Sequence, residues 1–124
     1  MKTSTTTIAG KEVTLAYCYG TEIAYKDFTN EDINDFMPEV AEALNSNRMP
    51  DIKKTVYLIL SAMTAFYRDK HSPIVDSDIL DEATPEELGK AIGTVLVLRA
   101  KFYNIPTGEP EDKATEDTEG AKKN

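Results

Sequence analysis

Residues that commonly carry chemistry are scarce in this 124-residue sequence. The single cysteine, Cys18, excludes an intramolecular disulfide and a cysteine-based metal cluster. The single histidine, His71, lies in a polar stretch with no nucleophile or carboxylate at a catalytic spacing, so we expect a surface residue rather than a general base. Cys18 lies on an expected strand among aromatic residues and is interpreted as a small apolar side chain rather than a nucleophile. The six glycines are scattered, which argues against a glycine-rich phosphate loop. The sequence therefore predicts a protein that is not an enzyme and that needs no cofactor.

Long apolar runs and clusters of basic residues are also lacking. No uncharged stretch reaches the roughly 18–20 residues that a helix needs to cross a bilayer, and the N-terminal MKTSTTTIAG has no apolar segment typical of a signal peptide. The net charge is −8, from 14 basic and 22 acidic residues, whereas phosphate binding needs clustered Lys and Arg. We therefore expect an intracellular, soluble protein that binds neither membrane nor nucleic acid.

Four acidic residues offer the best candidate for a metal site, and they do not fit one. Asp76, Asp78, Asp81 and Glu82 are spaced somewhat like calcium ligands, but the stretch lacks the glycine and the bidentate glutamate of a calcium loop. We expect a solvated acidic loop and predict no metal.

The composition changes sharply at Pro106. Residues 106–124 contain six acids and three lysines, with Ala114 and Ala121 as the only apolar residues. Such a segment cannot bury enough apolar surface to offset its ordering entropy. We expect a single domain over residues 1–105 and a disordered acidic tail over 106–124.

The N-terminus has the pattern of a β-hairpin. Thr5–Ile8 is rich in β-branched residues, Ala9-Gly10 is a plausible tight turn, and the following segment alternates, with Val13, Leu15, Tyr17 and Tyr19 on one face. We expect strands at about residues 4–9 and 12–19, with the apolar face lying on helices.

Four helical stretches follow. Their expected starts are Thr21 and Thr29 as N-caps, then Pro50 or Asp51, and finally the capping box Thr84-Pro85-Glu86-Glu87. Pro38 either kinks the second helix or begins a new one, and both alternatives stay open. The third stretch ends near Asp69 and contains Thr55–Phe66, twelve consecutive residues without a charge, which must be enclosed by the domain or by a partner. We therefore predict an α+β, mostly helical fold, with the hairpin on a small bundle of about four helices.

Aromatic and Met side chains exceed the needs of narrow helix stripes. Such residues are enriched in protein interfaces, although each also suits a small core. Our candidate partner-binding residues are Tyr57, Met63, Phe66, Tyr67, Phe102 and Tyr103.

The order of these elements resembles phage and prophage tail assembly chaperones. The resemblance covers roughly residues 5–105 and includes the hairpin closing at Gly10-Lys11, the strand Val13–Tyr19, the helix opening at Thr21-Glu22, the helix with Leu58-Ile59-Leu60-Ser61-Ala62, and the T-P-E-E-L helix from Thr84. It implies a protein of the bacterial host cytoplasm, encoded beside a long tape measure protein. Such chaperones coat the apolar helical segments of that protein and help tail tube subunits polymerise around it, and many have a longer frameshifted form.

The function expected from this resemblance is a non-enzymatic tail assembly chaperone. Its expected partners are the tape measure protein, the tail tube protein and further copies of itself. The alternative is a structural virion or head–tail adaptor protein, whose apolar helices would form a permanent oligomer interface.

Overall fold

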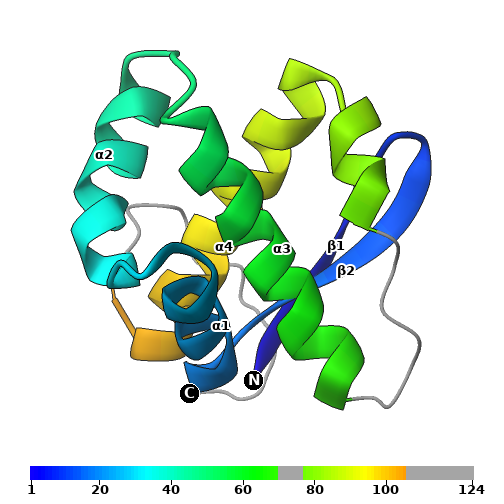
Figure 1. The fold of residues 1–124 in the computed structure, drawn as a ribbon. Coiled ribbons are helices and arrows are strands. Elements are labelled where there is room, and N and C mark those ends of the chain that lie inside the picture. Colours follow the sequence, from blue (N-terminus) through cyan, green and yellow to red (C-terminus); the bar gives the residue numbers. More distant parts are fainter. Residues whose placement is uncertain (70–76, 106–124) are drawn as a thin grey trace.

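The structure is a computed structural model and describes residues 1–69 and 77–105. Two antiparallel strands, β1 (Lys2–Ile8) and β2 (Lys11–Tyr17), are followed by α1 (Tyr19–Thr29), α2 (Ile33–Asn45) and α3 (Ile52–Asp69). A short 3₁₀ helix, η1 (Ser77–Glu82), precedes α4 (Pro85–Tyr103) (Figure 1). This arrangement confirms the predicted α+β, mostly helical fold with its N-terminal hairpin.

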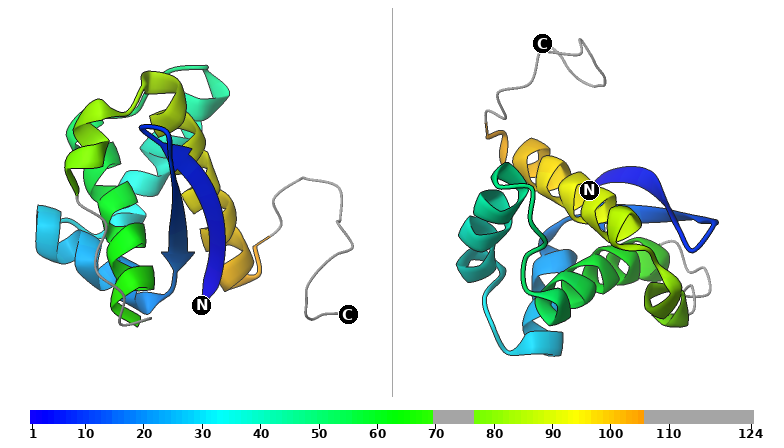
Figure 2. Two further views of the ribbon diagram at one scale, coloured as in Figure 1. Left: turned by 90° about the vertical axis from the view of Figure 1, so that its right-hand side faces the viewer. Right: turned by 90° about the horizontal axis from the view of Figure 1, so that it is seen from above.

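Helices α3 and α4 form the middle of the molecule. The hairpin covers one side of this pair, with β1 packed on α4 and β2 on α3, while α2 lies on the opposite side and α1 packs against α3 (Figures 1 and 2). One continuous hydrophobic core results, and it includes Leu15 from the hairpin, Phe36 from α2, Leu58 from α3 and Ile92 from α4.

The hairpin turn is built from two residues with positive φ. Ala9 (φ 53°) and Gly10 (φ 79°) connect strands whose closing pair is Ile8 and Lys11. This is the type I′ geometry, whose twist matches that of two paired strands. The predicted hairpin is confirmed, although β2 ends at Tyr17, so the expected strand residue Tyr19 lies instead in the first turn of α1 and is exposed.

Two predicted helix caps were wrong. Helix α1 begins after Cys18, and Thr21 lies inside its first turn, where its buried hydroxyl accepts a hydrogen bond from the Cys18 N–H at 3.2 Å. Helix α2 is capped by Asp32, whose carboxylate accepts from the Asn34 N–H at 2.8 Å, whereas Thr29 ends α1. Pro38 lies inside α2, which settles the alternatives in favour of a single helix.

The start of α4 has the predicted capping box, with both of its hydrogen bonds present. The Thr84 hydroxyl accepts from the Glu87 N–H at 3.1 Å, and the Glu87 carboxylate accepts from the Thr84 N–H at 3.0 Å, with Pro85 as the first helical residue. The same carboxylate oxygen also accepts from the Ala9 N–H of the hairpin turn at 2.9 Å. Glu87 therefore joins the helix start to the hairpin.

Several sequence features fall outside the described residues: His71, Asp76, the Asp78 side chain and the acidic segment 106–124. Asp81 and Glu82, the other two acids of the candidate calcium-like stretch, are exposed on η1.

Candidate protein-interaction surface

The uncharged run of α3 is enclosed by its own domain. None of the twelve residues Thr55–Phe66 is exposed, and Leu58, Ile59, Ala62 and Met63 are fully buried. The alternative left by the sequence, that a second chain encloses this run, is therefore not needed to account for its apolar character. The exposed apolar residues that could contact a partner lie outside this run.

The six candidate partner-binding residues lie in three different settings. Met63 is fully buried, so in this structure it belongs to the core. Tyr57 is half-buried and its ring stacks on Phe28, with centroids 5.6 Å apart.

The remaining four candidates form two aromatic pairs. Half-buried Phe66 and Tyr67 pack edge to face at 5.0 Å, and the Tyr67 hydroxyl accepts the Thr14 N–H of β2 at 3.3 Å. Phe102 and Tyr103 pack edge to face at 4.9 Å at the end of α4, where Tyr103 is 38% exposed. Of the six, Tyr103 alone ranks among the exposed large hydrophobic residues of the described chain.

Two exposed apolar residues of α1 extend the surface around Tyr103. Tyr19 is 65% exposed and Ile23 is 59% exposed, and their spacing of four residues places them on one face of the helix. The Tyr19 ring packs edge to face on Phe102 at 5.1 Å. We call Tyr19, Ile23, Phe102 and Tyr103 the α1–α4 patch.

The position of Tyr19 follows from the local structure at the start of α1. The buried Thr21 hydroxyl donates to the Ala16 carbonyl of β2 at 2.9 Å, which holds this first turn against the edge of the hairpin. With Thr21, Ala24 and Tyr25 turned inward, Tyr19 and Ile23 are left on the outer face. The sequence carried a signal for this surface, the i, i+4 spacing of Tyr19 and Ile23, but the prediction of Tyr19 as a strand residue concealed it.

Polar side chains hold the patch in place. Glu22 accepts hydrogen bonds from the hydroxyls of Tyr17, at 2.8 Å, and of Tyr103, so that one carboxylate ties α1 to the ends of β2 and α4. The hydrogen bond to Glu22, followed by burial, raises the pKa of Tyr103 to about 12. The Arg99 guanidinium lies over the Tyr103 ring at 5.4 Å and donates to the Asn34 side-chain oxygen at 2.7 Å.

A groove of about 430 Å³ lies beside the patch, between α1 and the start of α2. Tyr19, Ile23 and the almost fully buried Ile33 supply its apolar lining. Its charged lining residues are Glu22, Lys26, Asp27 and Asp32. An apolar floor with a polar rim is the arrangement typical of protein-binding surfaces.

A metal-ligand cluster and a membrane-spanning helix are both lacking among the residues that the structure describes. Within residues 1–69 and 77–105, no three His, Cys, Asp or Glu side chains are grouped so as to hold a metal ion. None of the described helices combines the length and the apolar character needed to cross a membrane.

Comparison of the chain with protein-family models, with curated proteins and with solved structures finds no match in any of the three.

Proposed function

We propose that this protein is a non-enzymatic tail assembly chaperone that binds apolar helical segments of a phage tape measure protein in the cytoplasm of the bacterial host. The observation that supports it most is the α1–α4 patch, where Tyr19, Ile23 and Tyr103 remain exposed although the domain has a complete core of its own. Exposed apolar side chains gathered on one surface are typical of a binding site for a partner.

The shape of the surface suits a helical client. The i, i+4 spacing of Tyr19 and Ile23 makes a ridge along α1, and the groove beside it has room for apolar side chains of a second helix. Lys26 and Asp27 on its rim carry opposite charges, which favours a client whose flanking residues are also charged. The net charge of −8 would keep a complex with an apolar client in solution.

The same surface provides for the other proposed partners. Before a client is bound, a second copy of the chain can cover the α1–α4 patch, which gives a reversible self-association. Contact with tail tube subunits is proposed for the later stage, when the tube polymerises around the coated tape measure protein.

The test is co-expression with the tape measure protein of the same phage, measured as the soluble fraction of that client. The patch variant combines Tyr19→Ser with Ile23→Asp, and the matched control is Ile52→Asp, which places the same charge at a residue of α3 that is 54% exposed. We expect wild type and control to keep the client soluble and the patch variant to lose most of this effect while retaining its helical circular dichroism. Equal client solubility with wild type and the patch variant would reject the proposal.

Mass spectrometry of purified virions separates a chaperone from a structural role. A chaperone should be absent from finished particles, because it leaves the client when the tube closes. Recovery of the protein in stoichiometric amount would replace the proposal with that of a head–tail adaptor.

A further inference from the structure

The two edges of the hairpin differ in the hydrogen bonds that they receive from other elements. On β2, the Thr14 N–H is bound by the Tyr67 hydroxyl and the Ala16 carbonyl by the Thr21 hydroxyl. On β1, the strand register turns the backbone groups of Thr3, Thr5 and Thr7 away from β2, because hydrogen-bonded and non-hydrogen-bonded pairs alternate from the Ile8–Lys11 pair. No hydrogen bond from another residue within 1–69 or 77–105 reaches these outward groups.

An open edge of this length is unusual unless it is protected. Strand β1 has seven residues and contains neither proline nor a bulge, and its outward-facing residues are three uncharged threonines. Such an edge is a template for pairing with another extended segment. The outer edge of β1 is therefore a candidate site for pairing with an extended segment.

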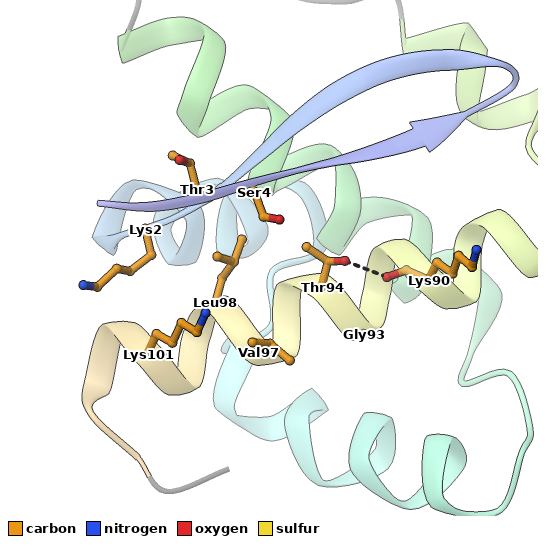
Figure 3. A pocket seen from close by; sticks show the side chains of 9 residues that line it. All are labelled: Lys2, Thr3, Ser4, Lys90, Gly93, Thr94, Val97, Leu98 and Lys101. Atoms are coloured by element: carbon orange, nitrogen blue, oxygen red, sulfur yellow. Dashed lines mark hydrogen bonds between the residues drawn. The ribbon is translucent and has the colours of Figure 1, made fainter. Parts of the chain in front are cut away.

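A groove of about 600 Å³ lies between α4 and the start of this edge, where Lys2, Thr3 and Ser4 of β1 line it. Lys2 and Lys101 stand at one end and Lys90 at the other, with Ser4 and Thr94 between them (Figure 3). No acidic residue is among the described residues that line it. On its floor, the space above Gly93 is open, since an added Cβ would meet nothing within 4 Å. The charged residues of this lining are thus all basic, which favours a ligand with negative charge.

We propose that residues 106–124 of this same chain bind in the groove, along the outer edge of β1. Their six acids and three lysines give a net charge of −3, which complements the three lysines of the groove. Helix α4 ends at Tyr103, two residues after Lys101, so the segment is tethered near the Lys2–Lys101 end of the groove. Because the segment is tethered there, binding is intramolecular and its effective concentration is high.

The lengths agree with this placement. Residues 111–119 hold five of the six acids and contain neither proline nor glycine. An extended stretch of that length spans about 30 Å, against about 23 Å for β1 and about 17 Å between Lys90 and Lys101 on α4. The five residues before it are enough to turn the chain back from the end of α4.

The test is amide hydrogen exchange of Thr3, Thr5 and Thr7 in the full-length protein, measured by NMR. One variant neutralises the tail through Glu109→Gln, Glu111→Gln, Asp112→Asn, Glu116→Gln, Asp117→Asn and Glu119→Gln. A second variant neutralises the groove through Lys90→Gln and Lys101→Gln, and the matched control is Lys53→Gln on α3. We expect exchange at the three threonines to become about tenfold faster in both variants and in high salt, since several exposed ion pairs together are worth about that factor. The control should exchange like wild type.

Two outcomes overturn the proposal. In one, the three threonines exchange at the same rate in wild type and in the tail variant, which means that the tail does not protect the edge. In the other, protection rises with protein concentration and survives neutralisation of the tail, which means that β1 pairs with a second copy of the chain. Circular dichroism of each variant verifies that the fold is retained.

Discussion

Two glutamates show how single residues hold this small domain together. Glu22 joins Tyr17 to Tyr103, and Glu31 accepts from the Tyr25 hydroxyl at 2.9 Å and from the Lys54 ammonium at 3.2 Å. Each carboxylate links elements that are distant in the sequence. The hydrogen bond to Glu31 raises the pKa of Lys54, and burial together with this same carboxylate raises the pKa of Tyr25.

The two tyrosines that share Glu22 should respond differently to its loss. Burial is the main reason that the pKa of Tyr17 is raised, whereas the hydrogen bond to Glu22 is the main reason that the pKa of Tyr103 is raised to about 12. In Glu22→Gln we expect the pKa of Tyr103 to fall toward the ordinary value of about 10, while that of Tyr17 stays raised. An alkaline titration of protein with ¹³C-labelled tyrosine, followed by NMR of each ring, measures the two pKa values separately.

The raised pKa values of these tyrosines also determine how the stability of the fold changes at alkaline pH. A phenol whose pKa is raised on folding contributes stability that is complete below about pH 10 and is lost as the pH rises through the folded-state pKa. Glu22→Gln should therefore reduce the loss of stability above about pH 10. Asp27→Asn, on the exposed side of α1, is the control and should titrate like wild type. An unchanged titration curve in Glu22→Gln would contradict the assignment.

At the scale of elements, the sequence predicts best where the signal is local. The capping box at Thr84 was confirmed because its hydrogen bonds join residues three apart. The predicted start of α1 was wrong. Thr21 has a side chain typical of an N-cap, but its hydroxyl donates a hydrogen bond to the Ala16 carbonyl of the hairpin. That bond depends on tertiary packing and has no signature in a window of a few residues. The patch residue Tyr19 was misplaced for the same reason.

The contact between Glu87 and the hairpin turn makes one element boundary sensitive to pH. The N–H groups of Thr84 and Ala9 bind the carboxylate and lower the pKa of Glu87. Since this pKa is lower in the folded protein than in the unfolded chain, its stabilisation is complete above the ordinary carboxyl value and is lost as the pH falls through the folded-state pKa. We expect Glu87→Gln to be less stable than wild type near neutral pH and the difference to shrink at about pH 3.

Urea unfolding at the two pH values measures this difference. Glu86→Gln is the matched control, because Glu86 is exposed in the same helical turn. The control should follow the wild-type pH dependence. A difference between Glu87→Gln and wild type that is equal at both pH values would show that the carboxylate charge is not responsible.

At the scale of the whole molecule, the single core encloses the uncharged run of α3. It also determines which apolar side chains stay exposed, and the sequence pattern does not show these. The uncharged run Thr55–Phe66 had to be enclosed, and it is enclosed by the hairpin and the other helices. Which apolar residues remain outside depends on how four helices and a hairpin share one interior. Ile52 illustrates this, since it has the spacing of the buried α3 stripe and is 54% exposed. Spacing alone therefore does not tell which apolar residues are exposed: of the six candidate partner-binding residues, Met63 is fully buried and Tyr103 is 38% exposed, and whether they bind a partner stays a prediction.

Ile52 and Met63 provide a matched pair on one helix that tests this single core. Met63 is fully buried among residues from the hairpin and the helices, so Met63→Ala should cost about 2–5 kcal/mol in the free energy of unfolding. Ile52→Ala should change it by no more than about 0.5 kcal/mol, because the side chain is largely in water already. Guanidinium unfolding followed by far-ultraviolet circular dichroism and by tyrosine fluorescence measures both. Because one core joins all elements, the two probes should shift together in Met63→Ala. Separate transitions for the helices and the tyrosines, or a similar cost for both substitutions, would show that the domain does not unfold as one unit around Met63.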